Sequence, residues 1–200
     1  MNRLPNSVYS ADSQLSNGLW AMTCRLSDDH PDGSTVEHPD PAWPLFWRTL
    51  ESAEGLVRVE FAEFVTPEAP PVWFVYVDEP LANPPAAILV AYANDRMPAG
   101  TVISKHRFPT LGIHSNEQVA AVRWYPADGL IHQLYVTEKW RRQQLGTRIL
   151  YAAGAFHIAN RWNGKLHADG RRTDLGERFV AAAQKPERAA PLTETMPPMD

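Results

Sequence analysis

A segment with helical spacing follows directly on three basic residues, Lys139, Arg141 and Arg142. The N-terminus of a helix exposes unpaired N–H groups and a partial positive charge, and both attract anions. Cations placed there oppose the helix dipole, which makes better sense if a polyanion such as a pyrophosphate lies between them. Gly146 would let the backbone approach that anion closely. A solvated basic turn without a ligand is the alternative that these residues leave open.

The elements on either side of this turn must position it. Two strand-like runs precede it, with turn residues at 126–129 between them. After the turn, Ile149, Ala152 and Phe156 follow helical spacing, and Asn163-Gly164 is typical of a helix end. The expected elements are strands at 118–125 and 130–136, a helix from about 145 to 162, a strand at 165–168 and a last helix capped by Thr173 or Asp174.

The first 117 residues carry weaker patterns, because prolines repeatedly interrupt the apolar runs. Residues 43–53 predict a short helix entered by Pro44, since proline suits the first helical turn. The other expected elements are a strand at 19–24, an irregular loop at 28–44, strands at 56–65 and 72–77, and a strand pair formed by 87–92 and 101–106.

The bulk composition is that of one soluble domain: 200 residues, of which 44% are hydrophobic and 21% charged. We expect a flexible arm at residues 1–18 and a disordered, proline-rich tail at 185–200. The first twenty residues lack a central apolar stretch, which argues against a secretory signal. No apolar run is long enough to span a membrane, so we expect a cytoplasmic protein without a membrane partner.

The charge distribution is uneven along the chain. The net charge of −4 argues against a general nucleic-acid binder. Residues 1–119 hold 7 basic and 15 acidic side chains, whereas residues 120–180 hold 10 and 5. The acidic half would favour a cationic substrate and the basic half an anionic ligand, unless the charges are simply spread over solvated faces. Cys24, the single cysteine, excludes an internal disulfide and a cysteine metal cluster.

The basic turn and its flanks resemble motif A of the GCN5-related N-acetyltransferases. Leu134-Tyr135-Val136 matches the family's L-x-V-like strand end, and residues 141–146 match in part its (Q/R)-x-x-G-x-(G/A) loop. Gln144 stands where the family usually has the first glycine. The resemblance covers residues 118–183 well and the first 117 residues only loosely.

This resemblance implies a mixed α/β (α+β) fold, in which helices flank a central mixed, mostly antiparallel sheet. The domain would span 19–184, with an acceptor-side half at 19–117 and an acetyl-CoA half at 118–184. In the family the motif strand parts from the next strand, and pantetheine lies in the gap. Backbone groups of Leu134, Tyr135 and Val136 would pair with it. The pyrophosphate loop would consist of Arg141, Arg142, Gln143, Gln144, Leu145, Gly146 and Thr147.

Acyl transfer to an amine also calls for a general base, because the amine must lose a proton. We assign this role to His132, four residues before Val136 and on the strand face expected for Leu134. Members of the arylalkylamine type resemble this in placing a histidine near the motif strand. A packed strand histidine with a structural hydrogen bond is the alternative. Glu117, before the preceding strand, is a second candidate base.

The resemblance therefore implies an N-acetyltransferase that moves an acetyl group from acetyl-CoA to a primary amine and requires no metal. The acceptor, which the acidic half would suit if cationic, and the oligomeric state stay open, although dimers are common in the family. A non-catalytic acyl-CoA-binding or protein-interaction module is the rival interpretation. Gln144, which stands at the usual glycine position, supports this rival. So does the lack of a tyrosine after Tyr151, since many members of the family use a late tyrosine to protonate the leaving thiolate. A basic helix that binds nucleic acid is a third interpretation, against which the apolar helix stripe and the acidic remainder speak.

Overall fold

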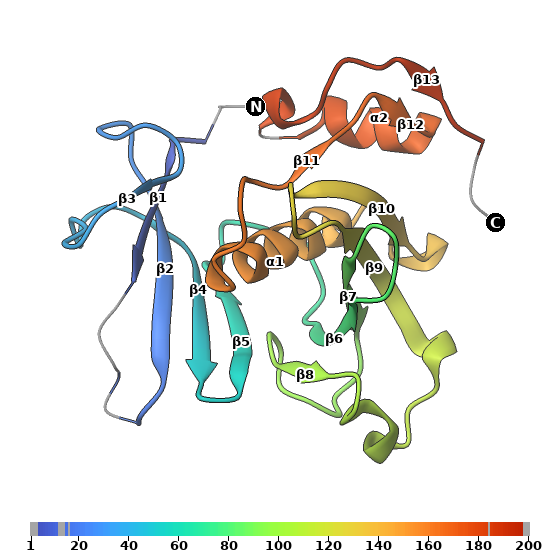
Figure 1. The fold of residues 1–200 in the computed structure, drawn as a ribbon, viewed down its shortest axis with the longest axis horizontal. Coiled ribbons are helices and arrows are strands. Elements are labelled where there is room, and N and C mark those ends of the chain that lie inside the picture. The colour runs from blue at the N-terminus through green and yellow to red at the C-terminus, as the bar shows by residue number, and fades with distance from the viewer. Residues whose placement is uncertain (1–3, 12–14, 16, 184, 198–200) are drawn as a thin grey trace.

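The computed structural model describes residues 4–11, 15, 17–183 and 185–197. Within these residues the chain forms a mixed α+β fold with two α-helices and two large, mostly antiparallel sheets (Figure 1). The helices are α1, Leu145–Ala159, and α2, Asp174–Ala181. In the described part of the chain, neither helix combines the length and the apolar character that crossing a membrane requires.

The first sheet has five strands in the order β3-β1-β2-β4-β5. Its central pairs are antiparallel, and only the short β3 runs parallel to β1. The strands are β1 Ser7–Ala11, β2 Trp20–Leu26, β3 Ser34–Thr35, β4 Leu45–Ser52 and β5 Gly55–Phe61.

The second sheet has six strands in the order β11-β10-β9-β7-β6-β8. The four inner strands are antiparallel, and the two edge strands β8 and β11 run parallel to their neighbours. Its strands are β6 Trp73–Glu79, β7 Ala86–Tyr92, β8 Val102–Ser104, β9 Gln118–Trp124, β10 Leu130–Val136 and β11 His167–Ala168. A separate parallel pair joins β12, Arg171–Arg172, to β13, Glu194–Thr195.

Helix α1 lies between the two sheets (Figure 1). It packs against β7, β9 and β10 on one side and against β4 and β5 on the other. Ala152, Ala153 and Ala155 are fully buried in these contacts. Their small side chains let the helix axis approach both sheets closely, while Ile149 and Phe156 fill the remaining core space. The helix is therefore rigidly held along most of its length.

The structure confirms the order of elements expected for residues 118–183. Strands β9 and β10 pair as predicted, α1 follows, and α2 begins at the predicted cap, where the Thr173 hydroxyl accepts the Gly176 N–H at 3.1 Å. The five-residue turn between β9 and β10 contains Gly129 with φ of 79°, a conformation that glycine adopts without strain. Local turn and capping chemistry explain why this half was predictable.

Two expectations for the first half are wrong. The predicted helix at 43–53 is strand β4, because long-range pairing with β2 and β5 overrides its local helical spacing. Strands β7 and β8 do not pair with each other. Both pair with β6, which lies inside the sheet although prolines between Pro67 and Pro85 flank it. The irregular loop at 28–44 is confirmed apart from the short strand β3.

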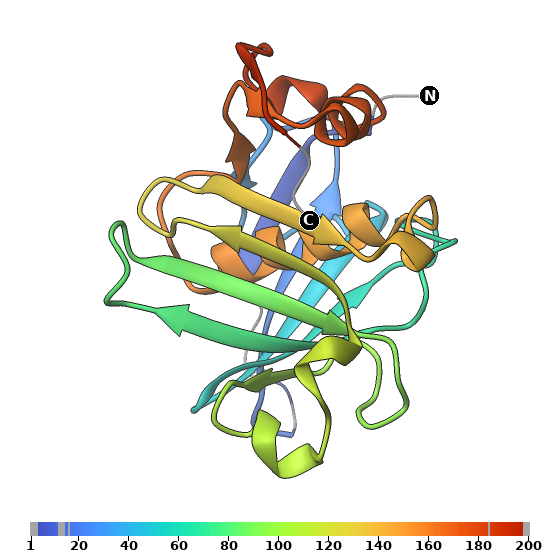
Figure 2. The ribbon, with the colours of Figure 1, turned by 90° about the vertical axis from the view of Figure 1, so that its right-hand side faces the viewer.

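The structure also differs from the expected flexible arm at 1–18 and disordered tail at 185–200. Residues 7–11 form β1, in which Val8 is buried. In the tail, Pro186–Arg188 form a short 3-10 helix and β13 pairs with β12. Residues 1–3, 12–14, 16 and 198–200 of these segments lie outside the described residues. Figure 2 shows α2 and the segment that follows it lying over one end of the two sheets, next to the N-terminal end of β1.

Candidate functional site

Strand β10 parts from its parallel neighbour β11 after two residue pairs. Leu130 pairs with His167 and Ile131 with Ala168, and the register ends there. A β-bulge between Ile131 and Gln133 interrupts the ladder to β9 at the same level. Bulges bend a strand and increase its local twist. The bulge thus coincides with the point at which β10 turns away from β11.

The backbone direction beyond the bulge follows from the pairing with β9. The Thr137 N–H donates to the Val119 carbonyl at 2.9 Å. In an antiparallel pair, residues alternate between pointing both backbone groups at the partner and pointing both away. The groups of Tyr135 therefore point at β9, and those of Leu134 and Val136 point away from it. Arg141 Nε, which donates to the Val136 carbonyl at 3.0 Å, occupies one of these outward positions.

A cavity of about 720 Å³ lies beside this edge of β10. One wall is a single stripe of α1 that includes Thr147, Tyr151, Gly154 and Ile158, spaced by three or four residues. The opposite wall comes from β10, the segment 165–173 and α2, with Ser7, Tyr9, Phe46 and Trp47 of the first sheet contributing at one side. The cavity is mostly apolar in its α1 wall and large enough for a drug-sized ligand.

The loop that enters α1 has an unusual backbone. Arg142 and Gln144 have positive φ of 61° and 55°, whereas Gln143 between them does not. Left-handed backbone of this kind favours glycine, because a Cβ atom crowds the following carbonyl oxygen. Gln144 is therefore strained at the position where the resembling family carries glycine. Alternating backbone of this type also turns successive N–H groups toward a common point, which is how anion-binding nests form.

We expect Gln144→Gly to raise the free energy of unfolding by about 0.5–1 kcal/mol, since relief of left-handed strain exceeds the added entropy of the unfolded chain. Gln143→Gly is the matched control. Because Gln143 does not have positive φ, glycine there relieves no strain and should lower stability. Urea denaturation of the two variants beside the wild type measures both effects. Equal losses in the two variants would contradict the strain argument.

The side chains of this loop have structural partners as well. Gln143 Nε2 donates to the Lys139 carbonyl at 3.2 Å, and Gln144 Oε1 accepts the Glu68 N–H at 3.4 Å. Arg141 and Arg142 are exposed. Leu145 is buried in the core. A Cβ at Gly146 would lie 3.2 Å from Phe179 of α2, so this glycine also lets the two helices pack closely. Of the predicted cofactor residues, the cavity is lined by Leu134, Gln144 and Thr147.

His132 lines the cavity, but it lies at an interruption of the regular strand alternation from which its position was predicted. It falls at the bulge and has no register partner on β9, so strand alternation does not fix its face relative to that of Leu134. Its side chain is exposed and its ring lies 5.4 Å from that of Tyr125, and both residues line the cavity. His132 is thus accessible to a ligand and to solvent.

Glu117 does not line the cavity. Its carboxylate accepts the His114 N–H at 3.0 Å in the short 3-10 turn Ser115–Glu117 before β9. The structure therefore places one candidate base, His132, beside the cavity and gives the other a local capping role. His157, which sequence reasoning did not single out, also borders the cavity: it is buried, its Nε2 lies 2.9 Å from the Asn163 carbonyl oxygen, and burial lowers its pKa.

The charged lining of the cavity is strongly basic. Asp169 is the acidic residue of the lining, and it pairs with Arg171 at 3.1 Å. The acidic side chains that outnumber the basic ones in residues 1–119 do not line the cavity. The cavity therefore lacks the negative charge that was expected to favour a cationic acceptor. The basic lining residues are Lys165, Arg171, Arg172, Lys185 and Arg188.

Comparisons of this chain with protein-family models, with curated proteins and with solved structures found no match. In the part of the chain that the structure describes, no group of three or more histidine, cysteine, aspartate and glutamate side chains is arranged to hold a metal ion. The functional argument therefore rests on the geometry of β10, α1 and the cavity between them.

Proposed function

We propose that the protein is an N-acyltransferase that moves an acetyl group from acetyl-CoA to a primary amine. The separation of β10 from β11 carries this proposal. It leaves the outward-pointing backbone groups of Leu134 beside a cavity of about 720 Å³, and those of Val136 follow on the same edge, where Arg141 Nε donates to the Val136 carbonyl. An extended ligand with amide groups, such as pantetheine, can pair with such an edge as an added strand does.

Three features support the resemblance to GCN5-related N-acetyltransferases. The strand that resembles the motif strand parts from the next strand, as it does in that family. The loop after it combines left-handed backbone with the N-terminus of a 15-residue helix. Such a helix end, with Arg142 exposed beside it, suits a pyrophosphate, because N–H groups and the helix dipole both attract negative charge.

Bound acetyl-CoA would supply the activated acyl group: the amine nitrogen would form a bond to the thioester carbonyl carbon, the carbon–sulfur bond would break, and coenzyme A would leave as a thiolate that takes a proton from water. This chain's own contribution would be to bind, orient and accept a proton. Backbone groups of Leu134 and Val136 would hold the pantetheine arm. His132 would take the proton that the amine loses, and its exposure beside the cavity allows that proton to pass on to water.

Calorimetric titration with acetyl-CoA tests the proposal. We expect saturable binding to the wild type and binding weakened by about tenfold or more in Arg142→Glu, because the new carboxylate repels the pyrophosphate. Arg96→Glu, an exposed charge reversal outside the cavity, is the matched control and should bind like the wild type. No binding to the wild type would contradict the proposal. Binding without turnover of any amine would favour a non-catalytic acyl-CoA-binding module.

A further inference from the structure

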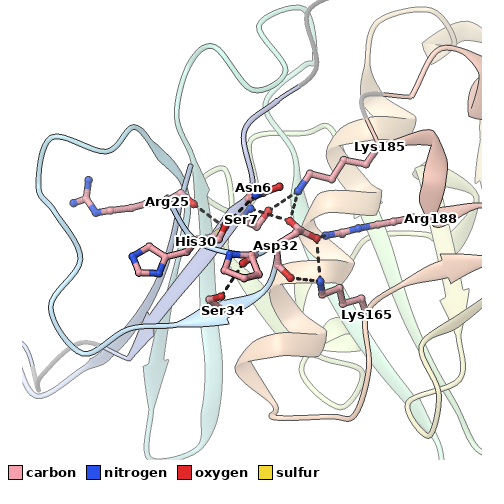
Figure 3. A network of polar contacts seen from close by, with 11 residues as sticks. Asn6, Ser7, Arg25, His30, Asp32, Ser34, Lys165, Lys185 and Arg188 are labelled. Atoms are coloured by element: carbon pink, nitrogen blue, oxygen red, sulfur yellow. Dashed lines mark hydrogen bonds and ion pairs between the residues drawn. The ribbon is translucent and has the colours of Figure 1, made fainter. Parts of the chain in front are cut away.

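Three cations converge on a single carboxylate at one side of the cavity (Figure 3). Asp32 Oδ1 accepts the Ser7 N–H at 2.8 Å and a hydrogen bond from Lys185 Nζ. Asp32 Oδ2 accepts from Lys165 Nζ at 3.0 Å and Arg188 Nη2 at 2.9 Å. A carboxylate offers about four lone-pair positions, so these four donors saturate Asp32.

The cations retain donors that Asp32 cannot accept. A lysine ammonium group has three N–H bonds. Among the described residues, Lys165 directs two hydrogen bonds at Asp32, one to its backbone carbonyl at 2.5 Å, and Lys185 directs one at Asp32 and one at the Ser7 hydroxyl, 3.0 Å away. Lys165, Lys185 and Arg188 all line the cavity, whereas Asp32 does not. The three cations, of which Arg188 also hydrogen-bonds the Tyr9 side chain, therefore contact both Asp32 and the cavity.

The cluster also has an excess of positive charge. Three cations against one carboxylate leave a charge of +2, and the Lys185 side chain is only 12% exposed. Burial and the neighbouring charge of Arg188 lower the pKa of Lys185, although the hydrogen bond to Asp32 acts in the opposite direction. Elsewhere in the lining, Arg171 and Arg172 each have a carboxylate, Asp169 and Glu177 respectively. The cluster thus differs from the balanced pairs beside it.

The position of the cluster separates it from the helix N-terminus. Arg188 acts electrostatically on Tyr151, near the middle of α1, and Lys165 follows the end of that helix. A helix of 15 residues is about 22 Å long. The loop at Arg142–Thr147 lies at its N-terminal end, and Tyr151 comes six residues, about 9 Å along the axis, after the first helical residue. One phosphate group cannot contact both places.

We infer that Lys165, Lys185 and Arg188 form an oxyanion site in the cavity wall, and that it binds a phosphate or carboxylate group of the acyl acceptor. The assignment to the acceptor rests on the proposed function; the oxyanion site itself does not. The remaining charge of +2 matches a phosphate better than a carboxylate, and the planar guanidinium of Arg188 suits two oxygens of either group. Acceptors with a phosphorylated or acidic tail are the expected substrate class.

Calorimetric titration with inorganic phosphate in a low-salt chloride buffer tests the site without acetyl-CoA. We expect saturable binding to the wild type, tighter than that of acetate, and at least about tenfold weaker binding to Lys185→Met. This variant keeps Lys165 and Arg188 on Asp32, and Arg188→Met provides a second test that keeps both lysines. Lys105→Met is the matched control, because it removes a lysine–aspartate pair, with Asp78, outside the cavity.

A purely structural cluster would give a different result. Absence of phosphate binding to the wild type, or equal binding to the wild type and both cavity variants, would overturn the site. Repeating the titration with saturating acetyl-CoA decides which molecule supplies the oxyanion. Phosphate binding that is retained supports the assignment of the site to the acyl acceptor. Competition between phosphate and acetyl-CoA would assign the site to a phosphate of acetyl-CoA and overturn the acceptor assignment. Failure of the proposed function would show separately, as absent acetyl-CoA binding beside intact phosphate binding.

Discussion

Asp32→Asn is expected to lower the free energy of unfolding by about 3 kcal/mol at pH 7, because it removes the carboxylate on which three partly buried cations converge. The substitution also replaces one acceptor oxygen with an N–H donor that faces these cations. Asp32 joins the loop before β3 to the segment after α1 and to the C-terminal tail, so the loss acts on three parts of the chain. Urea denaturation measures it.

The effect of Asp32→Asn should depend on pH in a defined direction. Burial raises the pKa of Asp32, but hydrogen bonds from Lys185, the Ser7 N–H, Lys165 and Arg188 outweigh it and hold the pKa well below its usual value. A depressed folded-state pKa gives stability that is complete above the unfolded value, about 3.9, and is lost as the pH falls toward the folded value. The difference between wild type and variant should therefore be constant from pH 7 to pH 5 and shrink below about pH 4.

Asp78→Asn is the control for this prediction. Asp78 pairs with Lys105 at 2.8 Å, and its side chain is 49% exposed. A single exposed ion pair contributes about 0–1 kcal/mol, so this variant should lose far less stability than Asp32→Asn at pH 7. Equal losses in the two variants would contradict a special role for the Asp32 cluster.

The Asp32 cluster also shows what the sequence could not predict. Asp32 and Lys185 are separated by 153 residues, and Lys185 begins a proline-rich tail whose composition favours disorder. No local periodicity connects them. The uneven charge of the two halves was the only signal. It predicted an anionic ligand for the basic half, which stays a prediction, and it did not locate the cluster, because Lys185 and Arg188 lie outside residues 120–180. The expected acidic counterpart did not gather at the cavity.

The motif region could be predicted because its signals are local. The strand, turn and helix around Gly146 follow from periodicity and turn residues within about thirty positions. The bulge at His132 could not be predicted, because it depends on how β10 meets β9 and β11 in space. It matters for the proposed function, since the exposed histidine lies at the bulge and β10 parts from β11 at the same level. Likewise, only long-range pairing distinguishes strand β4 from the helix that its spacing favours.

The location of the ligand can be tested at Gly154, which lies in the middle of the α1 wall of the cavity. A Cβ added there would meet no atom within 4 Å. Gly154→Ala should raise the free energy of unfolding by about 1 kcal/mol through helix propensity and leave the cavity open. Gly154→Trp should remain folded, because its side chain enters empty space, but the indole ring would occupy the path along α1 between Thr147 and Ile158.

We therefore expect Gly154→Trp to weaken acetyl-CoA binding by about a hundredfold or more, while Gly154→Ala binds like the wild type. The pair separates binding from folding, since both variants change the same helix position and neither should lose stability. Calorimetric titration with acetyl-CoA and urea denaturation of both proteins measure the two properties. Unchanged binding in a folded Gly154→Trp protein would mean that acetyl-CoA lies outside this cavity, and the parted edge of β10 would then lose its assigned role.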